Sequence, residues 1–302
     1  MNSKEEVKGI YYAVLAFVIW GLVPVYFKAV DHIDPLEVVS HRVIWSALFL
    51  ALVLLFSRRL LATFRILKSS RLVLGLLFSA LVVSLNWLVF IWAVGQERIV
   101  ETTLGYFINP LINIVFGFFV FSERLRFLQW CAVALAAFGV AYQLIIFGEL
   151  PWIALVLALS FSTYGVLRKK IKVDAVAGLF IETLWLSPLA IIYLLVLNHY
   201  GQLQFFQEGT DSMFLLLAAG LVTSFPLLAF AAGAKRISLT LLGFIQYLGP
   251  SIALLIAVYY YDEPMDMQRL VTFVFIWAAL VLFTVEGVVY QKGKLSAQDE
   301  LN

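Results

Sequence analysis

The sequence predicts an all-α membrane protein in which ten transmembrane helices form two inverted five-helix repeats. Of its 302 residues, 63% are hydrophobic and only 13% are charged, about half the charged share of roughly 25% in a soluble domain. The mean hydropathy of +0.97 is spread over the whole chain and not confined to one anchor. The two halves of the chain also resemble each other. These three observations support the predicted fold.

Charge and cysteine content exclude several classes of function. Lys and Arg number 21 against 19 Asp and Glu, and no basic tract lies among aromatic residues, so nucleic-acid binding is not expected. The single cysteine, Cys131, has no internal disulfide partner, and the three histidines lack metal-site spacing. We therefore expect no metal and no cofactor. The expected partners are a small-molecule substrate and membrane lipid.

Ten apolar stretches have the length of about 20 residues that a helix needs to cross a bilayer. The first follows Lys4 and Lys8 without a cleavage site, so we expect an uncleaved helix. In chain order the stretches are 9–28, 35–56, 72–94, 99–121, 127–147, 150–167, 175–197, 213–233, 237–260 and 269–289.

The distribution of Lys and Arg predicts the orientation of these helices. Of the 21, 17 lie in the two termini and in the loops or turns at 57–71, 122–126, 168–173 and 235–236, whereas the opposite loops hold Arg98 and Arg269 only. Cytoplasmic segments carry the excess of positive charge. Both termini are therefore expected in the cytoplasm, and the segment 198–212, which has no Lys or Arg, is expected outside.

An internal duplication divides the chain into residues 8–147 and 150–290. Residues 93–105 and 231–243 are identical at seven of thirteen positions. At an offset of 140 residues, Asp34 aligns with Asp174 and Arg42 with Glu182. Because five helices is an odd number, the second repeat must be inverted. Inverted repeats are typical of secondary transporters with a substrate site near the midplane.

Several runs of sequence resemble the drug/metabolite transporter superfamily, EamA type. They are SHRVIWS (40–46), NWLVFIWAV (86–94), LGYFINPL (104–111), SERLR (122–126), FSTYGVLRKK (161–170) and AKRISLTLLGFIQYLGP (234–250). The first and third separate one subgroup from other EamA proteins. The resemblance covers roughly residues 8–290 and implies a bacterial inner-membrane carrier with ten helices around a central cavity. It implies no particular substrate, direction of transport or coupling ion.

Charged residues inside the spans are the first functional candidates, because an ionisable group in the bilayer is costly. At a rise of 1.5 Å per residue, Arg42 lies about 10 Å inside the outer boundary of the membrane. Its repeat mate Glu182 lies at a similar depth from the inner boundary. We expect both to line the cavity, with a structural ion pair as the alternative. Glu37 and His41 are one turn apart and, with Glu101, are the candidates for proton coupling. Glu37 could instead cap its helix. Lys28 and Glu286 are expected to snorkel.

Prolines and polar or aromatic residues complete the predicted site. Prolines within spans are expected to kink the helices and free backbone carbonyls: Pro24, Pro110, Pro188, Pro226 and Pro250. Polar groups near the kinks are expected to line the substrate site: Tyr106, Asn109, Asn113, Gln246 and Tyr247. The alternative is that Asn113 and Gln246 form hydrogen bonds to neighbouring helices. Further candidates for substrate contacts are Trp20, His41, Asn86, Trp87 and Tyr164.

The predicted function is a carrier that moves a small amphipathic or zwitterionic solute by alternating access. An amino acid, an aromatic metabolite or a drug would fit. An intramembrane enzyme acting on lipid or peptide is the first alternative, but no Ser/His/Asp set or metal set lies within the spans. A passive channel is the second alternative. No GxxxG motif is present, and the sequence leaves the choice between monomer and homodimer open.

Overall fold

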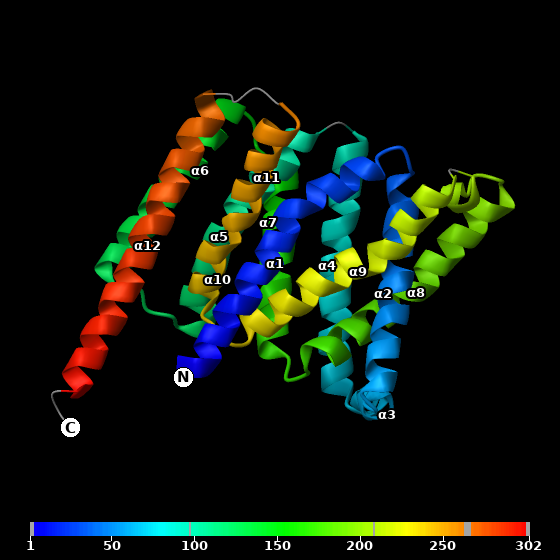
Figure 1. Ribbon diagram of the computed structural model, residues 1–302, viewed down its shortest axis with the longest axis horizontal. Coiled ribbons are helices and arrows are strands. Elements are labelled where there is room, and N and C mark those ends of the chain that lie inside the picture. Colours follow the sequence, from blue (N-terminus) through cyan, green and yellow to red (C-terminus); the bar gives the residue numbers. More distant parts are fainter. Residues whose placement is uncertain (1–2, 97, 208, 263–266, 300–302) are drawn as a thin grey trace.

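The computed structural model describes residues 3–96, 98–207, 209–262 and 267–299, and the regular structure in these ranges is helical (Figure 1). The elements are α1 (Ser3–Ala29), α2 (Pro35–Phe56), α3 (Leu60–Phe64), η1 (Arg65–Lys68), α4 (Ser70–Gly95), α5 (Ile99–Phe121), α6 (Phe127–Phe147), α7 (Trp152–Lys170), α8 (Ala175–His199), η2 (Gln204–Phe206), α9 (Gly209–Ala234), α10 (Leu239–Gln246), α11 (Leu248–Tyr260) and α12 (Met267–Asp299).

Within the described ranges, nine helices are long and apolar enough to cross a membrane, with α10 and α11 together providing one of them. The expected span 150–167 falls on α7, which is not among the nine. Its 19 residues end in Arg168, Lys169 and Lys170, and these cations lower its hydropathy. The all-α membrane fold is confirmed, and the tenth crossing stays a prediction.

The two ends of the molecule differ in the segments that they carry. The start of α1, the α3 turn and the end of α12 lie at the same end (Figure 1). At the other end, η2 is bonded to the N-terminus of α2, where the backbone N–H groups of Gln204 and Phe205 donate to the Glu37 carboxylate at 3.0 and 2.9 Å. The described residues of the segment 198–212 therefore lie at the opposite end from α3, as the charge distribution predicts.

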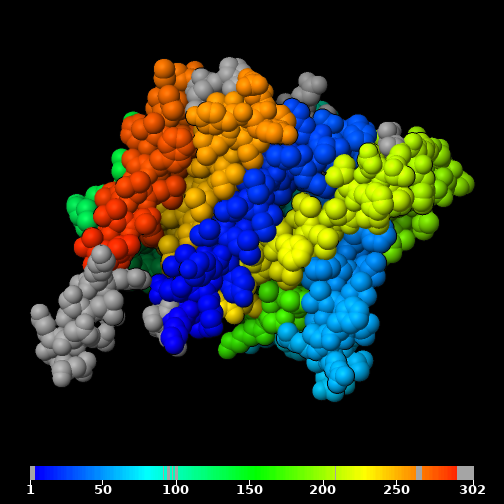
Figure 2. Space-filling view, in the orientation of Figure 1, coloured from blue at the N-terminus to red at the C-terminus, as the bar shows by residue number. Residues whose placement is uncertain are grey.

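The helices pack in crossing pairs. Figure 2 shows α1 lying diagonally between α9 and α11, and it contacts both. In the same way α7 contacts α4 and α5, while α2 packs on α8 and α9, and α6 packs on α12. Large apolar side chains also cover the outside of the bundle. Phe119, Leu189 and Tyr259 are 75%, 69% and 80% exposed, as expected of a surface that faces lipid.

Helices α2 and α8 begin with the same cap. The Asp34 side chain accepts a hydrogen bond from the N–H of Glu37 at 3.0 Å. The Asp174 side chain accepts from the N–H groups of Val176 and Ala177, both at 3.1 Å. An aspartate at this position satisfies backbone donors that the helix itself leaves unpaired. The two aspartates are the residues that align at an offset of 140.

Four of the five prolines lie inside continuous helices: Pro24 in α1, Pro110 in α5, Pro188 in α8 and Pro226 in α9. Pro250 lies in the first turn of α11, directly after the interruption at Tyr247 that separates α10 from α11. Here α10 crosses α5 closely, because a Cβ atom on Gly243 would lie 2.7 Å from the carbonyl oxygen of Pro110. Glycine is required at this crossing.

Candidate functional site

Arg42 in α2 is surrounded by aromatic rings and one hydroxyl group. Its Nε donates a hydrogen bond to Oγ1 of Thr223 in α9 at 2.8 Å. Its Cζ lies 5.4 Å from the ring centre of Phe27 in α1 and 5.2 Å from that of Trp87 in α4. These distances are typical of cation–π interactions. Three helices besides α2 therefore converge on this guanidinium.

Among the described residues, no acid forms an ion pair with Arg42. Inside the spans, Glu37 lies beside His41, Glu101 pairs with Arg98, and Glu182 pairs with Arg168. Arg42 thus carries a positive charge in the membrane region that a neutral hydroxyl and aromatic faces compensate only in part. A cation in such a place attracts an anionic ligand.

Glu182 pairs with Arg168 and not with Arg42, so the alternative of an ion pair between Arg42 and Glu182 is not formed in this structure. The Arg168 Nη1 donates to Glu182 Oε1 at 3.1 Å, and the Tyr164 hydroxyl donates to Oε2 at 3.3 Å. Arg168 and Glu182 are 0% and 1% exposed. Arg168 Nη2 also donates to the carbonyl oxygen of Ala175 at 3.2 Å. This pair joins α7 to α8 and leaves Glu182 without a free oxygen for a substrate.

An aromatic cluster occupies the centre of the bundle and brings Trp20 and Tyr164 close to one another. The Trp20 ring centre lies 5.5 Å from that of Phe161 and 5.7 Å from that of Phe230. Tyr164 stacks on Phe230 at 6.0 Å and is fully buried. The structure places both predicted residues in packed contacts, Trp20 partly buried and Tyr164 in the core. Tyr106, by contrast, is half-exposed, with its ring 6.4 Å from Phe90.

The polar residues at the crossing of α5 and α10 hydrogen-bond one another. Gln246 Nε2 donates to Asn109 Oδ1 at 2.5 Å, and Asn113 Nδ2 donates to Gln246 Oε1 at 2.8 Å. Asn109 Nδ2 reaches the carbonyl oxygen of Ala158 in α7 at 3.0 Å. The three amides are buried, so this network holds helices together, which is the alternative that the sequence left open.

Two more candidates also connect helices. The Tyr247 hydroxyl donates to the carbonyl oxygen of Phe107 at 3.3 Å, and Tyr247 is fully buried. Asn86 Nδ2 donates to the carbonyl oxygen of Leu157 and to the Ser160 hydroxyl, both at 2.9 Å. Of the predicted substrate contacts, Arg42 is joined to α9 by its hydrogen bond to Thr223, whereas Trp87 and Tyr106 make ring contacts with Arg42 and Phe90, respectively.

Glu37 and His41 lie together beneath the η2 segment. The Glu37 carboxylate accepts the two N–H groups of Gln204 and Phe205 and lies 3.7 Å from His41 Nε2. Trp45 Nε1 donates to His41 Nδ1 at 3.1 Å, and the His41 ring stacks on Phe205 at 4.7 Å. His41 Nδ1 is thus an acceptor, which places the proton of a neutral ring on Nε2, facing Glu37. The pair anchors the 198–212 segment as well as being a candidate for proton transfer.

The remaining charged candidates lie near helix ends. Glu101 forms an ion pair with Arg98 at 2.5 Å. Lys28 is exposed, with its Nζ 3.9 Å from the ring centre of Tyr261. The expectation that Glu286 snorkels is wrong: it is buried and accepts hydrogen bonds from Arg126 Nε and Nη2. These hydrogen bonds raise the pKa of the Arg126 guanidinium, which lies just before α6.

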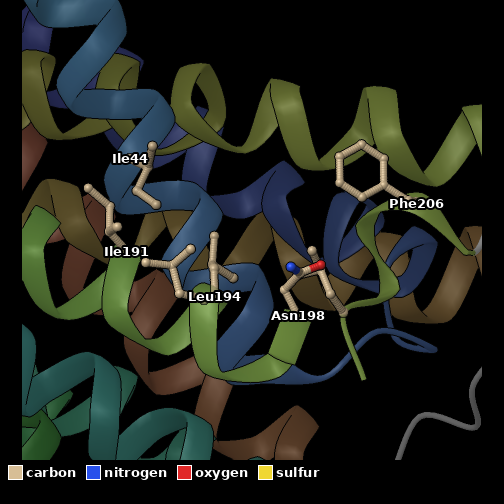
Figure 3. Close-up of a pocket in the computed structure, with 7 residues that line it drawn as sticks. Ile44, Ile191, Leu194, Asn198 and Phe206 are labelled. Carbon is tan, nitrogen blue, oxygen red and sulfur yellow. The ribbon is translucent and has the colours of Figure 1, made fainter. Parts of the chain in front are cut away.

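A shallow apolar hollow lies between α2 and α8 beneath Phe206 (Figure 3). Ile44, Ile191, Leu194 and Asn198 line it with Phe206. None of its lining residues is among the predicted substrate contacts. Its apolar wall and its position on the outside of the α2–α8 pair are features of a lipid-facing surface.

Sequence reasoning missed Arg168, Phe27 and Thr223. The charge pattern places Arg168 among the loop cations that set orientation, although it belongs to the last turn of α7. One signal could have found it, because the offset of 140 that aligns Arg42 with Glu182 also aligns Lys28 with Arg168. Phe27 and Thr223 carry no such signal, since phenylalanine and threonine are common in membrane helices.

Comparisons with known proteins agree on the family. The model of the EamA-like transporter family matches residues 7–145 and again 150–285. An uncharacterized transporter of Vibrio cholerae serotype O1 is 45% identical over 95% of both chains. A Salmonella typhi protein named RarD is 45% identical over 97% of this chain and 100% of its own. These matches confirm the family and the subgroup that SHRVIWS and LGYFINPL indicate.

A solved crystal structure with 18% sequence identity superposes with a TM-score of 0.70 and covers 92% of this chain and 97% of its own. At this identity the likeness establishes the fold alone. The family and the name of the Vibrio relative indicate a transporter and not an enzyme.

Proposed function

The chain belongs to the EamA-like transporter family, and on that premise we propose that it is a secondary-active transporter of the bacterial inner membrane. It moves a small amphipathic or zwitterionic solute, such as an amino acid, an aromatic metabolite or a drug, by alternating access through a central site. The observation that carries the proposal is Arg42, a cation in the membrane region without a carboxylate partner and set between the rings of Phe27 and Trp87.

The packing of the helices supports two inverted repeats, residues 8–147 and 150–290. If the halves are exchanged, the contact of α5 with α7 becomes that of α11 with α1, and the contact of α1 with α9 becomes that of α7 with α4; all four occur. The two matches of the family model and the shared aspartate caps of α2 and α8 have the same symmetry. Exchange of conformation between such halves is how many secondary transporters expose one site alternately to each side.

The contacts at the end of the bundle that carries α3 support a closed inner side. The buried pair of Arg168 and Glu182 joins α7 to α8. Lys235 in the turn after α9 donates to the carbonyl oxygen of Val173 in the turn after α7. Lys169 at the end of α7 donates to the carbonyl oxygen of Ile237 in the turn after α9. These bonds hold the two turns together. In the proposed cycle these contacts break when the site opens to the cytoplasm, where both termini lie.

Counterflow in proteoliposomes tests the transport function. A thermal-shift screen of the purified protein against amino acids, aromatic metabolites and amphenicols first finds a ligand, because a bound ligand stabilises the folded state. We expect uptake of that ligand, in labelled form, to accelerate when unlabelled ligand is loaded inside the vesicles. Equal uptake with and without internal ligand would support a channel, and hydrolysis of added lipid or peptide without flux would support an enzyme.

Reporter fusions test the proposed orientation separately. Tags in 57–71, in 168–173 and at the C-terminus should report the cytoplasm, and a tag in 198–212 should report the outside. A cytoplasmic 198–212 tag would contradict the inverted arrangement.

A further inference from the structure

The two halves carry different charges at one pair of aligned positions. The offset of 140 aligns Lys28 with Arg168 and Arg42 with Glu182. In each half the two positions lie on either side of the capping aspartate, Asp34 or Asp174. In the second half the pair has opposite charges and forms a buried ion pair at 3.1 Å. In the first half both positions are cations, so this half has no carboxylate of its own at the corresponding place.

Arg42 has only weak compensation for its charge. Its hydrogen bond goes to the neutral hydroxyl of Thr223 at 2.8 Å, and aromatic faces stabilise a cation by far less than an anion does. Lys28 is likewise placed on an aromatic ring, that of Tyr261, and forms no ion pair with a described residue. The first half therefore presents two positive charges, at Arg42 and Lys28, that form no ion pair with a described residue.

We propose that the anionic group of the transported solute supplies this partner and that the solute is a monocarboxylate with an aromatic or apolar body. The inference rests on the proposed function and narrows it. A carboxylate matches the planar donor fork of arginine. Phe27, Trp87 and the half-exposed Tyr106 provide the surface for the apolar body.

The same contacts disfavour recognition of a solute through an amine. Glu182, the acid that sequence alignment pairs with Arg42, has one oxygen bonded to Arg168 and the other to Tyr164. An ammonium group next to Arg42 would be repelled by the guanidinium charge. An amino acid therefore binds through its carboxylate, and its ammonium group weakens binding.

Three probes that share a phenylethyl body and differ in charge test this inference: 3-phenylpropionate, L-phenylalanine and 2-phenylethylamine. Each is measured on the purified full-length protein by thermal shift and in proteoliposomes by counterflow. We expect 3-phenylpropionate to bind most tightly, phenylalanine more weakly and phenylethylamine not at all. In Arg42→Gln we expect the affinity for 3-phenylpropionate to fall at least about 30-fold, because a buried charge pair loses one member.

Two further variants control for folding and for total charge. Arg42→Lys keeps the charge but not the planar fork, so it should bind 3-phenylpropionate with intermediate affinity. Arg65→Gln makes the same chemical change as Arg42→Gln at an exposed position in η1 and should bind like the unchanged protein. The comparison of the three probes on the unchanged protein does not depend on any variant being folded.

The outcomes separate the inference from the proposed function. Binding of phenylethylamine in preference to phenylpropionate, or equal affinity of Arg42→Gln for phenylpropionate, overturns the anion inference. Counterflow of phenylethylamine would then leave the transporter proposal standing. Binding and exchange of none of the three probes overturns the inference, while counterflow of another ligand from the screen would still support transport.

Discussion

Replacing Gly178 by alanine inserts a methyl group at the buried guanidinium of Arg168. A Cβ atom at this position would lie 2.7 Å from Nη2 and 2.8 Å from Cζ of Arg168, and Nη1 is in contact as well. The arginine has no free space, because its side chain is fully buried and bonded to Glu182 and to the carbonyl oxygen of Ala175. The methyl group must therefore displace the guanidinium from its carboxylate.

Two effects of opposite sign determine the magnitude. Alanine stabilises a helix interior relative to glycine by about 1 kcal/mol. Separating the members of a buried ion pair costs about 3–5 kcal/mol when one charge is left uncompensated. We therefore expect Gly178→Ala to lower the free energy of unfolding by about 2–4 kcal/mol. The assay is unfolding of the purified protein in mixed detergent micelles, followed by helical circular dichroism.

Gly287→Ala in α12 is the matched control, because no atom lies within 4 Å of a Cβ there. It should be neutral or slightly stabilising. A second test places Gly178→Ala in a protein that also carries Arg168→Met and Glu182→Met. With the guanidinium gone, the alanine should no longer destabilise, as a double-mutant cycle measures. Equal stability of Gly178→Ala and Gly287→Ala in the unchanged background would refute the packing that we describe.

Three further predictions concern other contacts. Gln246→Leu leaves the amides of Asn109 and Asn113 short of partners and should lower the free energy of unfolding by about 1–3 kcal/mol, measured in the same micelles; an unchanged value would contradict the network. Glu37→Gln removes one of two acceptors for the η2 backbone and should speed hydrogen exchange at Gln204 or Phe205. We also expect this variant to lose the acceleration of uptake by a pH gradient and to keep counterflow. Full gradient-driven uptake would exclude Glu37 as the coupling group. Burial, followed by the nearby charge of Arg168, lowers the pKa of Lys235, just after α9, to about 8. Since the folded protein then binds fewer protons than the unfolded chain, stability should rise between pH 8 and about 10.5, and Lys235→Met should lack this part of the rise in thermal midpoint.

Hydropathy and charge were sufficient to predict the helical membrane fold, because that fold depends on the composition of whole segments. The depth of Arg42, which was inferred from the rise of a helix per residue, stays a prediction. The partner of Glu182 could not be predicted in this way. It depends on how far α7 is rotated toward α8 and on whether Arg168 belongs to a helix or to the turn that follows. A hydropathy window does not distinguish these two positions.

The role of the amides at the α5–α10 crossing was also beyond the sequence. Asn109, Asn113 and Gln246 have the chemistry either to bind a substrate or to bond one another. The distance between α5 and α10 decides which of these two roles the amides have. Gly243 sets this distance, because it allows the Pro110 carbonyl group to approach α10. The sequence contains the glycine but does not show its neighbour in space, so the sequence alone leaves both alternatives open.

The pairing of Arg168 with Glu182 has a consequence for how the protein is made. The two residues lie fourteen positions apart on consecutive helices joined by a short turn. Because α7 ends in three cations and is not among the nine helices apolar enough to cross alone, we expect it to leave the translocon together with α8 as a hairpin. The carboxylate would then neutralise the guanidinium before either reaches lipid. Glu182 would thus act during biosynthesis, before any solute is bound.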